Sequence, residues 1–228
     1  MAAGGADAMN IEQILFDISE ALRWPVLVLA LLALLAVILE LGSLFVEMRR
    51  RRGRSIWALE RAVAECQQRL AAGQTVEALA TLLPLAHNKA MEEALEGIFA
   101  QVGRPDAEAR ISKRLAEYDY LSLRRLERTR ILVRFGPALG LMGTLIPLSP
   151  ALAGLADGDV ETLTENLRVA FGVTVAGLLV GAIAFTISLV RDRLYAQDYS
   201  DVEYIAATLT AGTAHLPVGH HSHWAVAP

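Results

Sequence analysis

Cysteine is nearly absent from this sequence, and several classes of protein are excluded by what the chain lacks. Cys66 is the only cysteine among 228 residues, which excludes an intrachain disulfide and any metal site built from several thiolates. The formal net charge is only -4, and the basic residues lie beside apolar runs and form no patch of their own. This pattern argues against a nucleic-acid partner.

Catalytic and cofactor motifs are also missing. The sequence has no Ser/His/Asp order, no phosphate-binding loop and no pair of carboxylates in an apolar setting, so we expect no enzyme, no catalytic residue and no cofactor. Four histidines, His215, His220, His221 and His223, lie in the C-terminal tail. They have no cysteine or acidic companions there, so we expect adventitious metal binding at most and no metal site.

Apolar residues, in contrast, are abundant. They make up 54% of the chain, give a mean hydropathy of +0.39, and concentrate in three runs at residues 24–46, 135–156 and 169–190. A helix of about 20 residues crosses a hydrocarbon core of roughly 30 Å. The runs therefore predict an all-α, polytopic membrane protein with three transmembrane helices and a helical cytoplasmic domain.

Arginines at the ends of these runs predict the orientation. Four consecutive arginines at residues 49–52 follow the first run, further arginines between residues 124 and 134 precede the second, and Arg191 and Arg193 follow the third. Because cytoplasmic loops carry an excess of Lys and Arg, all three runs place these ends in the cytoplasm and the N-terminus outside.

Periodicity and breaks complete the predicted organisation. The apolar side chains of residues 10–22 lie on one helical face, typical of a helix that lies in the membrane interface or packs on the first span, and both interpretations stay open. We predict an extracytoplasmic amphipathic segment at 1–23, transmembrane helices at 24–46, 135–156 and 169–190, a cytoplasmic helical domain at 47–134, an extracytoplasmic loop at 157–168, and a cytoplasmic helix extension with a disordered tail at 191–228.

Glycines distinguish the second and third runs from the first. They form two stripes, Gly136, Gly140 and Gly143 on the second helix and Gly177 and Gly181 on the third. Small residues let helix backbones approach closely in lipid, so we expect the second and third helices to face protein and the first to face lipid.

Two threonines, Thr144 and Thr174, lie beside these glycine stripes. In a membrane helix such a hydroxyl either donates to the carbonyl of the preceding turn or lines a path for ions, and spacing alone leaves both roles open. The second and third runs contain no Asp, Glu, Lys, Arg or His. A proton path through them therefore needs a titratable group from a partner.

Two segments carry a resemblance to a known family. The run Gly136-Pro-Ala-Leu-Gly-Leu-Met-Gly-Thr-Leu and the run Ala170-Phe-Gly-Val-Thr-Val-Ala-Gly-Leu-Leu resemble the paired core helices of the MotA/TolQ/ExbB proton channel family. The likeness covers roughly residues 130 to 195, and the three-helix topology with the N-terminus outside resembles the ExbB/TolQ branch.

The resemblance implies a function. Members are ion-channel subunits of stator-like motor complexes in the inner membrane, and Thr144 and Thr174 correspond to hydroxyl residues that line the family's pore. It also implies a homopentamer around a dimer of an ExbD/TolR/MotB-like one-span subunit that supplies a membrane aspartate. We expect protons as the ion and membrane lipids as surroundings; a non-conducting oligomeric scaffold is the alternative.

Some positions differ from the family pattern, and others lie outside the segments that carry the resemblance. Relatives of the ExbB/TolQ branch usually carry a glutamate where this chain has Val169. Pro137 matches a proline of the flagellar branch and is either a flexing point or a first-turn proline. Pro147 and Pro150 are expected to free carbonyls and kink the second helix, which either shapes the outer mouth of a pore or starts the outer turn early. Glu40, the only charge in the first run, is expected to snorkel or to bond between helices.

Overall fold

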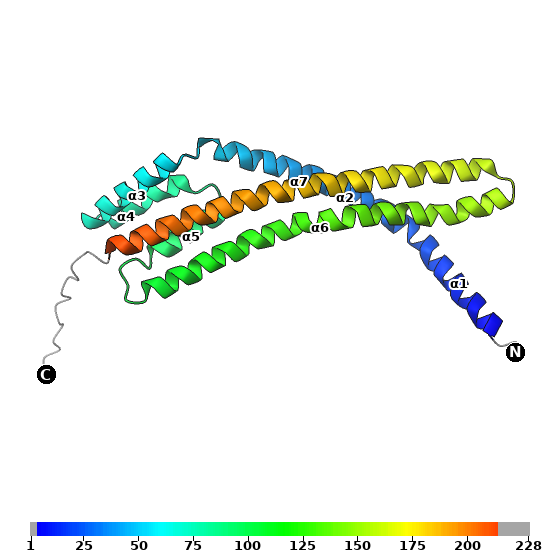
Figure 1. Ribbon diagram of the computed structural model, residues 1–228, viewed down its shortest axis with the longest axis horizontal. Coiled ribbons are helices and arrows are strands. Elements are labelled where there is room, and N and C mark those ends of the chain that lie inside the picture. Colours follow the sequence, from blue (N-terminus) through cyan, green and yellow to red (C-terminus); the bar gives the residue numbers. More distant parts are fainter. Residues whose placement is uncertain (1–3, 214–228) are drawn as a thin grey trace. The chain divides into compact units, whose positions relative to one another are not determined.

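The computed structural model describes residues 4–213, and every regular element in that range is helical. The elements are α1 (Gly4–Ala21), α2 (Arg23–Arg50), η1 (Arg51–Gly53), α3 (Ile56–Ala71), α4 (Thr75–Leu82), η2 (Leu83–Leu85), α5 (Lys89–Phe99), α6 (Ala107–Ala156) and α7 (Val160–Thr213), as Figure 1 shows. Three segments, Gln13–Gly53, α6 and Val160–Ala211, are long and apolar enough to cross a membrane, which confirms the predicted fold class. The tail histidines lie outside the described residues.

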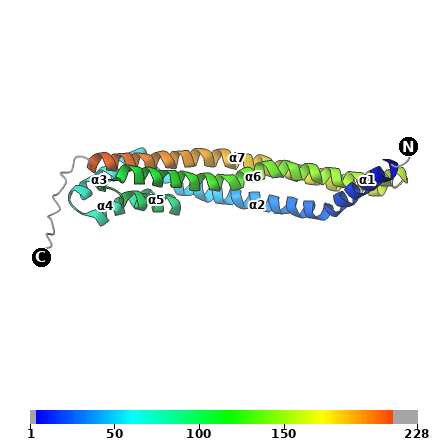
Figure 2. The same ribbon diagram turned by 90° about the horizontal axis from the view of Figure 1, so that it is seen from below.

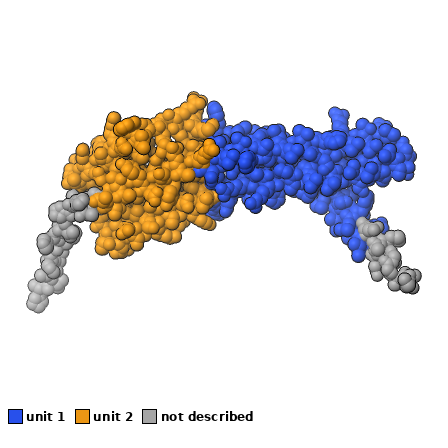
Figure 3. All heavy atoms as spheres, viewed as in Figure 1, with its two compact units in different colours: residues 1–46, 124–192 blue, residues 47–123, 193–228 orange. Residues whose placement is uncertain are grey.

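The chain divides into two compact units, coloured separately in Figure 3. Unit 1 comprises residues 1–46 and 124–192, and unit 2 comprises residues 47–123 and 193–228. Helices α6 and α7 each contribute to both units, because each continues without a break past the end of its apolar run. Helix α6 begins at Ala107, just after Pro105, and runs without interruption through the second apolar run to Ala156.

In unit 1, α6 and α7 lie side by side as an antiparallel hairpin in both views (Figure 1, Figure 2). Gly158 forms the turn with a φ of +78°, a conformation that glycine adopts without steric cost. Asp159 then begins α7, because its carboxylate accepts the backbone N–H of Thr162 at 3.0 Å. The hydrogen bonds from Thr162 hold the pKa of Asp159 below its usual range. The predicted loop at 157–168 is therefore corrected: residues 160–168 are the first turns of α7.

Helix α2 has one buried stripe. Its buried side chains recur every three or four residues over most of the helix and are Val26, Ala30, Ala33, Val37 and Leu44. Neighbouring residues such as Leu31 and Leu39 are exposed. The expectation that the first span faces lipid is thus corrected for one of its faces, since α2 packs that stripe inside unit 1 and leaves the rest for lipid.

Helix α1 leaves its apolar face uncovered. The side chains that the sequence places on that face are all exposed, namely Ile11, Ile14, Leu15, Ile18 and Leu22. A different part of α1, including Phe16 and Ser19, borders a small hollow with Ile146 and Pro150 of α6. Of the two open interpretations, the exposed face favours a helix that lies in the membrane interface.

Unit 2 has a core of its own. Amphipathic helices α3, α4 and α5 bury Val63, Cys66, Leu82, Leu95 and Ile98 against the parts of α6 and α7 that belong to this unit. Asn88 starts α5 by accepting the backbone N–H of Met91 at 3.0 Å. Cys66 is fully buried and packs in this core, and its burial raises the pKa of the thiol. The helices of this unit are separated at Gly73 and Gly103, both with positive φ, and at the Pro84 turn.

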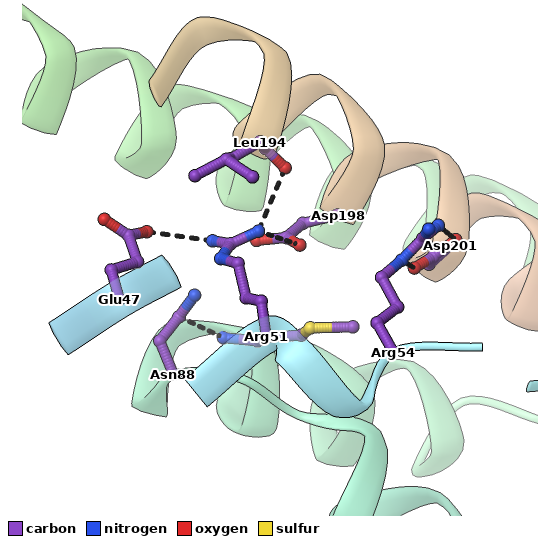
Figure 4. A network of polar contacts seen from close by, with 8 residues as sticks. Glu47, Arg51, Arg54, Asn88, Leu194, Asp198 and Asp201 are labelled. Atoms are coloured by element: carbon purple, nitrogen blue, oxygen red, sulfur yellow. Dashed lines mark hydrogen bonds and ion pairs between the residues drawn. The ribbon is translucent and has the colours of Figure 1, made fainter. Parts of the chain in front are cut away.

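A network of ion pairs ties the end of α2 and the arginines that follow it, in and just after η1, to α7 inside unit 2 (Figure 4). The buried Arg51 donates to Asp198 at 2.5 Å and to Glu47 at 2.8 Å. Arg54 forms a two-bond pair with Asp201, at 2.8 and 2.6 Å. Two of the arginines in the 49–54 segment therefore stabilise unit 2, whereas Arg49, Arg50 and Arg52 are exposed.

The Arg51–Asp198 pair predicts a pH-dependent stability defect. Burial raises the pKa of Asp198 and Arg51 opposes that rise, so Arg51→Met leaves a carboxylate buried without its closest cation. Such a loss costs about 3 kcal/mol at neutral pH. A carboxyl with a raised pKa stabilises the folded state in its protonated form, so the defect shrinks as pH falls from about 7 towards about 5.

Thermal unfolding of the detergent-solubilised protein at both pH values measures this defect. Asp198→Asn serves as the comparison, because its amide oxygen still accepts from Arg51 and Glu47 still offers a counter-charge; we expect it to cost less than about 1 kcal/mol. Equal losses in the two variants, or a defect of Arg51→Met that does not change with pH, would contradict this account.

Candidate functional site

Glycines bring the backbones of α6 and α7 into direct contact in unit 1. A Cβ added to Gly177 would lie 2.5 Å from the carbonyl oxygen of Gly136 and 2.7 Å from the Cα of Gly140. A Cβ on Gly136 would lie 2.8 Å from the Gly177 oxygen. No larger residue fits at these positions unless the helices separate, because the obstructing atoms are backbone.

The hairpin continues on either side of this contact. A Cβ on Gly143 would overlap the side chain of Val173, and one on Gly181 would lie 2.8 Å from Cγ of Pro137. Gly181 thus provides the space that the ring of Pro137 occupies. Pro137 lies well inside α6, so the interpretation as a first-turn proline is wrong, and both Pro137 and Pro147 interrupt helical hydrogen bonding within a continuous helix.

Thr174 lies at the level where the glycines meet. Its side chain is half-buried, and its hydroxyl oxygen lies 3.1 Å from the carbonyl of Ala170 on its own helix and 3.3 Å from the carbonyl of Gly140 on α6. The single hydroxyl hydrogen serves one of these carbonyls at a time, and the oxygen keeps lone pairs that can accept a hydrogen bond. Thr174 therefore belongs to the helix interface and also carries an available acceptor.

Thr144 lies one turn beyond Gly140 on α6. It is half-buried, and its hydroxyl donates to the carbonyl of Leu141 at 2.7 Å. The hydrogens of both threonines are thus committed to backbone carbonyls. The oxygens of both side chains can still accept a hydrogen bond from a third group, in a stretch of helix that has no charged residue.

On α6 and α7, charged residues begin only beyond the apolar runs. Glu165 and Arg168, both within about one turn before Val169, are exposed on α7. Asn166 between them is buried, donates to the carbonyl of Thr162 and accepts from Arg23 of α2 at 2.9 Å. This contact fixes the start of α2 to α7 within unit 1.

A second polar cluster joins all three long helices of unit 1 at the other end of the apolar runs. Arg191 of α7, only 6% exposed, donates to Glu40 of α2 at 2.5 Å, to Thr129 of α6 at 2.9 Å and to Ser43 of α2. The interhelical option for Glu40 is therefore confirmed. From the sequence, Arg191 was predicted only to flank the membrane. The signal that could have found this pair is Glu40, because a lone carboxylate in an apolar run indicates a nearby cation.

The Glu40–Arg191 cluster predicts a defined stability change. Arg191→Met leaves Glu40 without its cation and is expected to cost about 3 kcal/mol, whereas a double variant Glu40→Leu with Arg191→Met is expected to recover most of that loss. Thermal unfolding in detergent measures both, with the exposed Arg193→Met as the matched control within about 0.5 kcal/mol of the unmodified protein. A double variant no better than Arg191→Met would contradict the pairing.

The outer faces of the hairpin are apolar and uncovered. Phe171 and Val175 of α7 are 64% and 66% exposed, and Leu141, Leu145 and Leu152 of α6 are exposed as well. Side chains of this kind at membrane depth contact lipid or another protein. In the described part of unit 1, α6 and α7 thus pack tightly along the contact of their glycines, here called the glycine seam. Their outer faces are left exposed.

Together these features define a multi-pass membrane protein whose core is a glycine-packed helical hairpin with hydroxyls and no titratable group. The profile of the MotA/TolQ/ExbB proton channel family matches residues 84–198, about half of the chain, and the chain belongs to this family. No curated protein and no solved structure gave a significant match. The matched region contains α5, α6 and the part of α7 up to Asp198, and so includes Thr129 and Arg191 of the second polar cluster.

Family membership confirms several predictions. The family consists of proton channel subunits of stator-like motor complexes in the inner membrane, it is not enzymatic, and its members act with a MotB/ExbD/TolR-type subunit. The chain is accordingly a multi-pass membrane protein of an inner-membrane channel family.

Proposed function

We propose that this chain is the proton-conducting subunit of a rotary motor of the ExbB/TolQ branch, with Thr144 and Thr174 lining the ion path. The observation that carries this proposal is the pair of half-buried hydroxyls at the glycine seam of two helices that contain no titratable residue. Such helices solvate a proton but do not bind one.

The missing proton carrier belongs to the partner. An aspartate on the partner's single membrane helix takes up a proton from one side, moves past Thr144 and Thr174, and releases it on the other side. The lone pairs of the threonine oxygens accept the hydrogen bond of the protonated carboxyl and so lower the cost of moving it through an apolar wall. Each protonation and release drives rotation of one component against the other.

The proposed assembly is a pentamer around a partner dimer. The exposed flanks of α6 and α7 supply the apolar surface that neighbouring copies cover, and the arginine-rich ends of the three spans lie in the cytoplasm with the N-terminus outside. Pro137, set against Gly181, is the position at which α6 flexes as the partner turns.

Co-purification with the product of a neighbouring one-span gene tests this proposal. We expect a stable complex, and single-particle images that contain five copies of this chain around two of the partner. A partner-free oligomer that keeps its cellular role after deletion of the one-span gene would overturn the proposal in favour of a non-conducting scaffold.

A further inference from the structure

A hollow of about 290 Å³ opens on unit 1 at the end of the hairpin that carries the arginines. It is bordered by three charged residues, one hydroxyl and three apolar side chains, namely Arg130, Arg134, Asp192, Ser188, Val133, Phe185 and Leu189. The apolar members belong to the ends of the second and third spans or lie directly beside them. The hollow therefore lies at the boundary between hydrocarbon and the polar region of the membrane.

The charges around this hollow do not balance. Arg130 pairs with Asp192 at 3.2 Å. Arg134 is exposed and has no ion-pair partner among the described side chains, those of residues 11 and 13–211, and the Ser188 hydroxyl has no hydrogen-bond partner among them. One guanidinium and one hydroxyl thus remain available at the same hollow, with a net charge of one positive unit.

We infer that the hollow binds the phosphate of an anionic phospholipid. A phosphodiester carries one negative charge and accepts hydrogen bonds through two oxygens, which matches the guanidinium of Arg134 and the hydroxyl of Ser188. The site is distinct from the threonine path, and its occupation does not depend on the channel function.

The apolar half of the hollow favours a lipid over a soluble phosphate. Phe185 and Leu189 are about half exposed and continue the apolar surface of α7 towards the middle of its span. An acyl chain that follows this surface is removed from water together with the two side chains, whereas inorganic phosphate gains nothing from them. Arginines near a membrane surface attract anionic headgroups by about 1 kcal/mol each, which corresponds to roughly fivefold in affinity.

Native mass spectrometry of the full chain in detergent tests this inference. Phosphatidylglycerol and phosphatidylcholine with identical acyl chains are titrated against the unmodified protein, Arg134→Gln, Ser188→Ala and the control Arg128→Gln. Arg128 is exposed on the same helix but does not border the hollow. We expect a preference for phosphatidylglycerol that falls roughly fivefold in Arg134→Gln, falls less in Ser188→Ala and is unchanged in Arg128→Gln.

Three outcomes would overturn the inference. The first is equal phosphatidylglycerol binding by Arg134→Gln and the unmodified protein. The second is displacement of the lipid by inorganic phosphate at equal concentration, which would assign the hollow to a soluble anion. The third is a change in oligomer mass in Arg134→Gln with no change in bound lipid, which would assign it to a protein contact.

Discussion

Replacing Thr174 by valine is expected to reduce ion-driven function severely while leaving the protein folded and in the membrane. Valine keeps the shape of threonine but loses the oxygen that accepts from a passing carboxyl. Loss of one such hydrogen bond in a dry path costs about 1.5 to 3 kcal/mol, which slows transfer roughly tenfold to a hundredfold. The measurement is proton flux in cells that co-express the partner, normalised to membrane level.

Thr186→Val is the matched control for this prediction. Thr186 lies on the same helix, is exposed, and donates to the carbonyl four residues earlier at 3.0 Å, as Thr174 does. Hydrogen bonds between membrane helices contribute about 0.6 kcal/mol on average, so Thr174→Val, which also loses the contact with the Gly140 carbonyl, should lose only about that much more stability than Thr186→Val. If flux falls equally in both variants, or persists in Thr174→Val, Thr174 has only a packing role.

Gly177→Ala is expected to have the largest effect on structure. The added methyl would lie 2.5 Å from the Gly136 oxygen and 2.7 Å from the Gly140 Cα, and neither atom can rotate away. The helices must separate, at a cost of about 3 kcal/mol or more. We expect little protein in the membrane and a strongly lowered unfolding temperature in detergent.

Gly172→Ala separates this effect from a general effect of removing glycine. Gly172 lies on the same helix, and a Cβ there would meet nothing within 4 Å. Alanine is the better helix former by about 1 kcal/mol, so this variant should be as stable as the unmodified protein or slightly more so. A stable Gly177→Ala protein would contradict the close backbone contact of α6 and α7.

Local sequence patterns predicted most of the fold, because membrane helices can be recognised from the length and hydropathy of apolar runs. The three apolar runs, the break at Gly103 and the long helix into the second span all follow from residues close in sequence. The start of α7 could not be predicted in this way, because the acidic residues from Asp157 to Glu161 are typical of a loop. Only the hydrogen bond from Thr162 to Asp159 shows that the helix begins at Val160.

The polar clusters were the least predictable features. The bond between Glu40 and Arg191 joins residues far apart in the chain, and the register of three helices decides which arginine reaches the carboxylate. The same holds for Arg51, which belongs to a run of four arginines of which only this one is buried. The glycine stripes, in contrast, follow from helical spacing, but which glycines meet which depends on where the turn falls.

Proton flux into proteoliposomes tests the central claim most directly, namely that this chain forms a path but lacks the proton carrier. Vesicles receive the chain alone, the chain with its one-span partner, or the chain with a partner whose membrane aspartate is replaced by asparagine. We predict flux driven by a membrane potential only in the second case. Equal flux from the chain alone, or from the complex with the asparagine partner, would contradict the account.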